Sequence, residues 1–115
     1  MNILIQNSQL KVCAKYGVTP FPCNSSQKLG ISLSVREGVV PIHGMRHNPT
    51  AETSGWYVWA GEWSDSADFF KPLHVEHLKT WCPRILPMLQ LAPGWRFLLA
   101  PAVEDVWFDA ALLHE

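Results

Sequence analysis

The feature that most limits how this chain can fold is the tryptophan-rich stretch GWYVWAGEWSDSADFFKPLHVEHL. Its first part predicts a β-strand over residues 55–62. Successive side chains of a strand point to opposite faces of the sheet, so Trp56 and Val58 would lie on one face. Tyr57 and Trp59 would lie on the other. Because both faces are apolar, each needs a cover, either from a second layer of the same domain or from a partner.

The length and composition predict one folded domain spanning residues 1–115. The chain has 115 residues, of which 48% are hydrophobic and 17% are charged, as is typical of a globular protein. No apolar run approaches the roughly 18 residues needed to cross a bilayer, and the first residues lack the basic start of a secretory signal. We therefore expect a cytoplasmic protein that neither spans nor binds a membrane.

The residue pattern predicts an α+β fold. We expect an antiparallel sheet of about four to five strands with helices packed on one face. Residues 1–28 would form an N-terminal helix and loop, and residues 29–113 the core. The expected helices run from Asn7 or Ser8 to Tyr16, from His74 to Trp81, and in a broken or second short segment to Leu91. The expected strands cover residues 31–35, 39–45, 55–62, 95–100 and 103–109.

Two of these strands are expected to form a hairpin. Ile31, Leu33 and Val35 alternate with polar residues, which predicts a half-buried strand. A turn at Glu37–Gly38 would lead into the returning strand. Pro41 would confine that second strand to an edge or a bulge, because proline has no N–H to donate to a neighbour.

The three cysteines, Cys13, Cys23 and Cys82, do not fit a disulfide framework. Their number is odd and no CxxC spacing occurs, which also argues against a zinc ribbon. We expect small thiols, buried or half-buried, in a reducing compartment.

Charge and aromatic residues together argue against nucleic acid as a partner. The formal net charge is −1, so the chain has no overall attraction to polyanions. Acids accompany the aromatic residues in GEWSDSADFF and EDVWFD, whereas nucleic-acid binding needs basic residues there. We expect the arginines within strands, Arg46 and Arg96, to pair with acids such as Glu62 or Asp109.

The histidines of His74-Val-Glu-His77 are a candidate for catalysis. On a helix the two rings would share one face and could hold a metal ion, with the intervening glutamate as a base. The spacing differs from the HExxH and HxxEH motifs of zinc enzymes. Neither a GxSxG motif nor a glycine-rich phosphate loop is present. We therefore expect no enzyme and no cofactor, with a small metal-dependent hydrolase centred on His74 and His77 as an alternative.

The acidic and aromatic stretch predicts a surface that binds a basic protein. Tryptophan supplies contact area at low entropic cost, and carboxylates steer association. The predicted partner-binding residues are Trp59, Glu62, Trp63, Asp65, Asp68 and Phe69. A homodimeric adaptor domain that uses the same patch is a further alternative.

Five segments, in this order, resemble the bacterial immunity protein 33 family of polymorphic-toxin systems: PIHGMRHNP, SGWYVWAGE, DFFKPLHVEHL, LAPGWRFLLAP and EDVWFD. The resemblance covers roughly residues 29–113. It implies a non-enzymatic protein, encoded beside a secreted toxin, that binds the toxic domain and protects the producing cell. It implies no particular interface residues, so the site above depends on the residue pattern alone.

Overall fold

The computed structural model describes residues 3–114, in which six strands form one mixed sheet. In chain order the elements are α1 (Ile3–Tyr16), β1 (Lys28–Ile31), α2 (Leu33–Arg36), β2 (Ile42–Arg46), β3 (Thr53–Ala60), β4 (Lys71–His74), η1 (Val75–His77), α3 (Leu78–Trp81), η2 (Pro83–Met88), β5 (Trp95–Ala100), β6 (Val103–Phe108) and η3 (Ala110–Leu113). The sheet order is β4-β1-β3-β2-β5-β6, and only β1 and β3 are parallel. The α+β class is confirmed, although the sheet is mixed and has one more strand than predicted.

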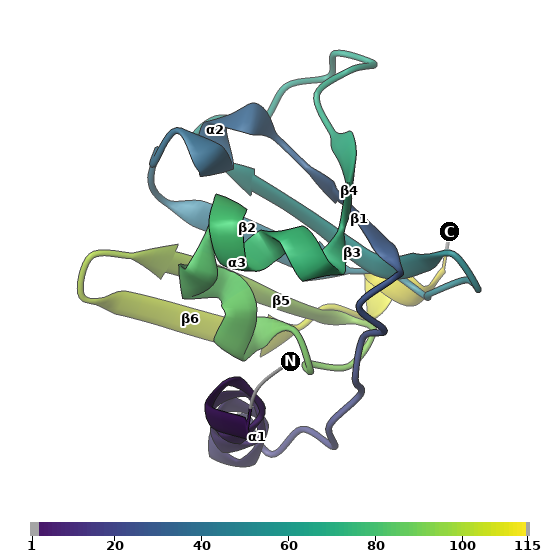
Figure 1. The fold of residues 1–115 in the computed structure, drawn as a ribbon, viewed down its shortest axis with the longest axis vertical. Coiled ribbons are helices and arrows are strands. Elements are labelled where there is room, and N and C mark those ends of the chain that lie inside the picture. The colour runs from purple at the N-terminus through teal and green to yellow at the C-terminus, as the bar shows by residue number, and fades with distance from the viewer. Residues whose placement is uncertain (1–2, 115) are drawn as a thin grey trace.

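Helical segments cover one face of this sheet. In Figure 1, α3 and η2 lie in front of the strands, and α1 packs against η2. None of the helices within residues 3–114 has the length and apolar character needed to cross a membrane.

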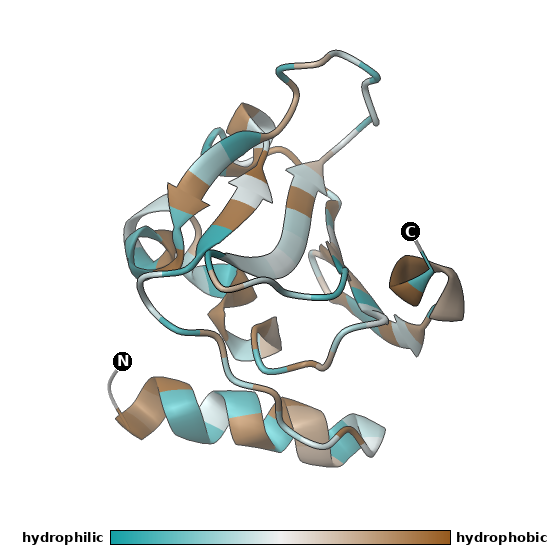
Figure 2. Ribbon diagram, turned by 90° about the vertical axis from the view of Figure 1, so that its right-hand side faces the viewer, coloured by the Kyte–Doolittle hydropathy of each residue, from teal (hydrophilic) through white to brown (hydrophobic). Residues whose placement is uncertain are grey.

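The alternation of side chains along the strands places the core beneath these helices. Trp56 and Val58 of β3 are 1% and 0% exposed and belong to the core. Gly44 of β2 pairs with Phe97 of β5, and a Cβ at Gly44 would lie 2.1 Å from the Phe97 ring. The missing side chain at Gly44 therefore makes room for that ring. The alternating brown and paler bands on the strands in Figure 2 show how hydrophobic residues alternate with more polar ones along each strand.

The N-terminal helix begins earlier than predicted. Asn7 and Ser8, the predicted starting points, both lie inside it, and the Ser8 hydroxyl donates to the Ile5 carbonyl, 2.7 Å away, as an interior helical serine does. The helix ends at Gly17, whose φ of +69° suits glycine. On its inner side, Gln9 donates to the Leu86 carbonyl at 2.9 Å and accepts from the Gln90 amide at 2.8 Å.

The predicted hairpin between residues 31–35 and 39–45 is wrong. β1 ends at Ile31 and pairs with β3 and β4, while β2 lies between β3 and β5. The hydroxyl of Ser34 donates to the Ala60 carbonyl at 2.9 Å and accepts from the Ala60 N–H at 3.3 Å. These side-chain bonds satisfy backbone groups at the end of β3 that a longer β1 would have paired, so the chain turns into α2.

Pro41 does not place β2 at an edge. It lies directly before Ile42, the first residue of the strand, so its missing N–H falls outside the ladder. Its carbonyl accepts from the Gly61 N–H at 2.9 Å. The strand that follows is central in the sheet.

The helix predicted from His74 to Trp81 is shorter and is preceded by a strand that the sequence pattern did not reveal. His74 is the last residue of β4, and the helical stretch divides into η1, α3 and η2. Apolar residues spaced three and four apart along this stretch, the pattern of one helical face, are nevertheless all buried: Val75, Leu78, Cys82, Ile85 and Leu89. β5 and β6 occupy the positions predicted for the last two strands.

A fully buried arginine joins the sheet to the segments packed on it. Arg46 of β2 is 0% exposed. Its Nε donates to the Ser54 carbonyl at 2.9 Å, and its Nη1 lies 2.7–3.1 Å from the carbonyls of Phe21, Leu89 and Leu91. The expected pairing of Arg46 with an acid is wrong: within residues 3–114 it forms no ion pair with a carboxylate.

Several weaker contacts compensate the buried charge of Arg46. The guanidinium carbon lies 5.0 Å from the ring centre of Phe21 and 5.6 Å from that of Trp56, close enough for cation–π attraction. Nη2 lies 3.4 Å from the Cys23 sulfur. The Leu89 and Leu91 carbonyls follow the C-terminal end of η2, where a helix leaves acceptors without partners and favours a cation.

We expect Arg46→Met to destabilise the domain by about 3–5 kcal/mol, because four carbonyls, three of them in buried hydrogen bonds, lose a charged donor at once. Urea unfolding followed by far-UV circular dichroism measures this loss. The control is Arg84→Met, a change at an exposed arginine of η2, which should leave the midpoint unchanged. A loss below about 1 kcal/mol for Arg46→Met would contradict this role.

Candidate functional site

The face of the sheet opposite the helices carries mainly aromatic side chains, together with Met45 and Arg96. Cross-strand pairs place Met45 beside Tyr57 and His43 beside Trp59. Met45 also pairs with Arg96 of β5. We call this surface the open face; it comprises His43, Met45, Tyr57, Trp59, Arg96 and Trp107.

The loop of residues 61–70, at the top of Figure 1, brings the rings of Trp63 and Phe70 against Trp59. The ring centre of Trp59 lies 5.1 Å from that of Trp63 and 6.2 Å from that of Phe70, in both cases edge-on. His43 stacks on Trp59 at 4.9 Å. Trp59 is consequently 6% exposed. It was expected to be an aromatic anchor at the surface, but it lies beneath the loop.

Trp63 is the exposed member of this ring cluster. It is 51% exposed, although its ring centre lies 5.7 Å from that of Phe69 and 5.6 Å from that of Phe70. Its indole N–H donates to the Asp65 carboxylate at 2.9 Å. A large ring held from several sides before binding loses little conformational freedom on binding.

The three predicted acids of this loop, Glu62, Asp65 and Asp68, are all exposed. Asp68 accepts a hydrogen bond from the Ser66 hydroxyl and lies 3.9 Å from the Lys71 amine. These two contacts lower the pKa of the Asp68 carboxyl below its usual range. The structure thus presents Trp63, Phe69 and the acids on one loop, with Trp59 as their support.

Arg96 organises the other end of the open face. Its Nη1 donates to the Asp109 carboxylate at 3.1 Å, which confirms the predicted pairing. The guanidinium lies 5.5 Å from the ring centre of Trp107, which is 39% exposed. The Nε of Arg96 is buried and has no hydrogen-bond partner within residues 3–114.

Two histidines lie between these ends. The ring of His47 meets Tyr57 edge-on, with the ring centres 5.3 Å apart, and its Nδ1 lies 3.2 Å from the Leu112 carbonyl. Burial, and secondarily the positive charge of Arg96, lowers the pKa of His43 and of His47 below the usual histidine value. Both rings therefore favour the neutral form in the folded protein.

Sequence reasoning missed His43, Arg96 and Trp107 as neighbours of the tryptophan-rich strand. In the sheet β5 lies beside β2, although β3, β4 and the helical segments separate these two strands in the chain. The signal available in the sequence was the alternation of residues within each strand, which indicates a face but not the strands beside it.

The histidines proposed for a metal site do not share a helical face. His74 ends β4 while His77 belongs to η1, and their ring centres are 6.1 Å apart. Both are exposed. Within the part of the chain that the structure describes, no three His, Cys, Asp or Glu side chains are grouped so that they could hold a metal ion. Cys13, Cys23 and Cys82 are free thiols.

These features define the class of protein: a small α+β domain with helices on one face of its sheet and aromatic rings on the open face. The family model for the Imm33-like domain matches residues 8–109, so the chain belongs to this immunity-protein-like family. No curated protein and no solved structure matches the chain.

The lowered pKa of the two histidines predicts a loss of stability in acid. Between the folded and unfolded pKa values the unfolded state binds more protons, so the free energy of unfolding falls as pH drops below about 6.5. Urea unfolding at pH 7.5 and at pH 5.5 should show this fall in the wild type. The decrease should be smaller in His43→Gln and in His47→Gln.

The control for this experiment is His77→Gln, a change at an exposed histidine outside the open face. It should retain the full wild-type dependence on pH. The interpretation is wrong if the His43 and His47 variants lose as much stability in acid as the wild type does.

Proposed function

We propose that this chain is a non-enzymatic immunity protein that binds a cognate secreted toxin domain and neutralises it by occlusion. Membership of the Imm33-like family supports a role of this kind. The observation that carries the proposal is the one-sided covering of the sheet. On the uncovered side Tyr57, Trp63 and Trp107 remain 37%, 51% and 39% exposed, although large aromatic side chains contribute most when they are desolvated.

The chemistry of the loop suggests how the partner would be recognised. Trp63 is already positioned by its neighbours and would insert as an anchor, as tryptophan commonly does in interfaces. Glu62, Asp65 and Asp68 surround it and would pair with basic side chains of the toxin. Trp59, being buried, would support Trp63 from below instead of touching the toxin. A stable interface of this type buries roughly 1,200–2,000 Å² in total.

We also propose that the protein acts in the bacterial cytoplasm. A toxin that reaches the interior of the producing cell would have to be bound there, and three free thiols are compatible with a reducing compartment.

Binding to the toxin domain encoded beside this gene tests the proposal. We expect Trp63→Ala to weaken binding at least about tenfold in isothermal titration calorimetry, because the anchor ring is lost. The double change Asp65→Lys and Asp68→Lys should slow association and reverse its dependence on salt. Circular dichroism should show that both variants fold.

Matched controls lie on α2, on the helix-bearing side. Leu33 is 52% exposed, close to the fractional exposure of Trp63, so Leu33→Ala removes an exposed apolar side chain away from the loop. Glu37→Lys reverses an exposed charge there. Both should bind like the wild type. If the toxin domain binds the loop variants as tightly as the wild type, the loop is not the interface. A homodimeric adaptor would instead appear as a concentration-dependent doubling of mass.

A further inference from the structure

A pocket of about 230 Å³ opens beside Tyr57, where β1 and β3 lose their register. Lys28 pairs with Thr53 and Gly30 with Tyr57, so β1 advances by two residues while β3 advances by four. The extra residues of β3 form a bulge, a feature that bends a strand and redirects side chains near functional sites.

The backbone holds this bulge in place. Gly55 has a φ of +88°, and a Cβ at this position would lie 2.1 Å from the His47 carbonyl oxygen. The hydroxyl of Ser54 donates to the Lys28 carbonyl at 3.0 Å and accepts from the Trp56 N–H at 3.3 Å. The pocket is therefore part of the fold and does not depend on one mobile side chain.

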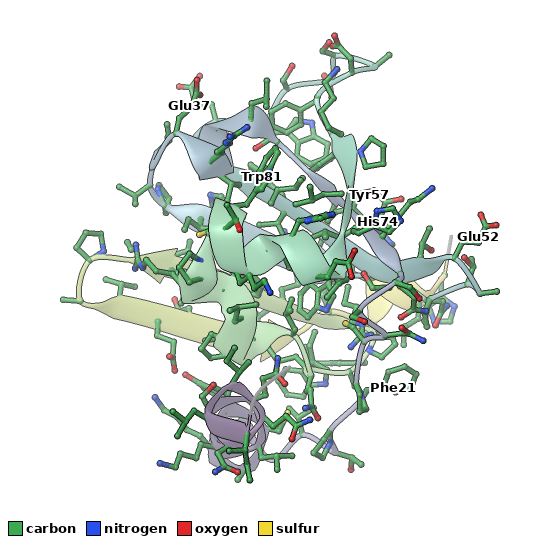
Figure 3. The ribbon with its side chains drawn as sticks, in the orientation of Figure 1. Phe21, Glu37, Glu52, Tyr57, His74 and Trp81 are labelled. Carbon is green, nitrogen blue, oxygen red and sulfur yellow. The ribbon has the colours of Figure 1, made fainter. Side chains whose placement is uncertain are left out.

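The walls of the pocket are apolar. The Tyr57 ring lies against Gly30, where a Cβ would be 2.7 Å from a ring carbon. Phe70 meets Tyr57 edge-on with ring centres 5.2 Å apart, and Pro72 adds to the lining. Figure 3 labels Tyr57 of β3 and His74 of β4, the two strands that flank β1.

The charged side chains that line the pocket are both lysines. Its lining includes Lys28 and Lys71 and no acidic residue. Lys71 lies 3.9 Å from Asp68. The amine of Lys28 has neither a hydrogen bond nor an ion pair within residues 3–114, so it is available to an incoming anion.

We propose that this pocket receives one aromatic or large aliphatic side chain of the partner protein, with a carboxylate beside it that pairs with Lys28. The inference rests on the proposed function and specifies the partner's chemistry at a second point of the open face. The volume is sufficient, since a cavity of about 150 Å³ already admits benzene. The apolar walls favour an apolar side chain. The lysines, and the absence of acids from the lining, favour a carboxylate beside that side chain.

The pocket and the loop would together orient the partner. The acids of the loop attract basic groups, whereas Lys28 attracts an acid next to an apolar side chain. A partner turned the other way would bring like charges together, which is unfavourable. Two adjacent surfaces of opposite charge thus provide specificity that an aromatic face alone would lack.

Indole-3-acetate serves as a probe that needs no toxin. In ¹H–¹⁵N NMR spectra of the full chain, it should shift the amides of Gly30, Gly55 and Tyr57 with a dissociation constant of about 1 mM, as expected for a ligand of this size. Acetate, which lacks the ring, should not shift them. Neutral indole-3-acetamide should bind at least about threefold more weakly, because it cannot form the ion pair with Lys28.

The variant Lys28→Gln should abolish the preference for the acid over the amide. Lys79→Gln, a change at an exposed lysine of α3, should retain it. Shifts confined to other amides, no shifts at all, or equal binding of acid and amide by the wild type would overturn the inference.

The toxin domain separates this inference from the proposed function. Lys28→Glu should weaken toxin binding at least about tenfold, and Lys79→Glu should not. If the wild type and Lys28→Glu bind the toxin equally well, the pocket inference is wrong while the proposed function stands. If the wild type does not bind the toxin although the pocket binds indole-3-acetate, the proposed function is wrong.

Discussion

The buried guanidinium of Arg46 is the interaction on which the arrangement of this domain depends. Burying a cation without a carboxylate is costly unless hydrogen bonds replace its water. Here four carbonyls, two aromatic rings and a thiol do so. These groups belong to β3, to the segment after α1 and to the end of η2. One side chain of a central strand therefore determines where the N-terminal segment and the helical layer meet the sheet.

That layer covers one face of the sheet only, and the other face obtains a partial cover from residues 61–70. The result is a gradient of burial within one ring cluster, from Trp59 at 6% exposure to Trp63 at 51%. Three neighbouring rings and the Asp65 hydrogen bond contact the exposed ring from several sides. A pre-ordered aromatic surface beside acids is suited to rapid and specific protein binding.

Sequence reasoning succeeded where a pattern depends on neighbouring residues. The strands predicted over residues 95–100 and 103–109 correspond to β5 and β6, and the three- and four-residue spacing of apolar residues from Val75 to Leu89 indicates a stripe that is buried. It failed where a distant contact decided the outcome. Ile31 to Val35 alternates like a strand, yet Ser34 bonds to Ala60 and the segment becomes α2.

The sequence by itself determined that one strand has two apolar faces and that acids accompany its aromatic residues. These are properties of residue type and local spacing. Only the tertiary structure decided which strands lie side by side, that Trp59 is covered and Trp63 is not, and that a bulge opens a pocket with Lys28 at its lining. The physical reason is that register and burial arise from contacts between residues far apart in the chain, which local periodicity does not encode.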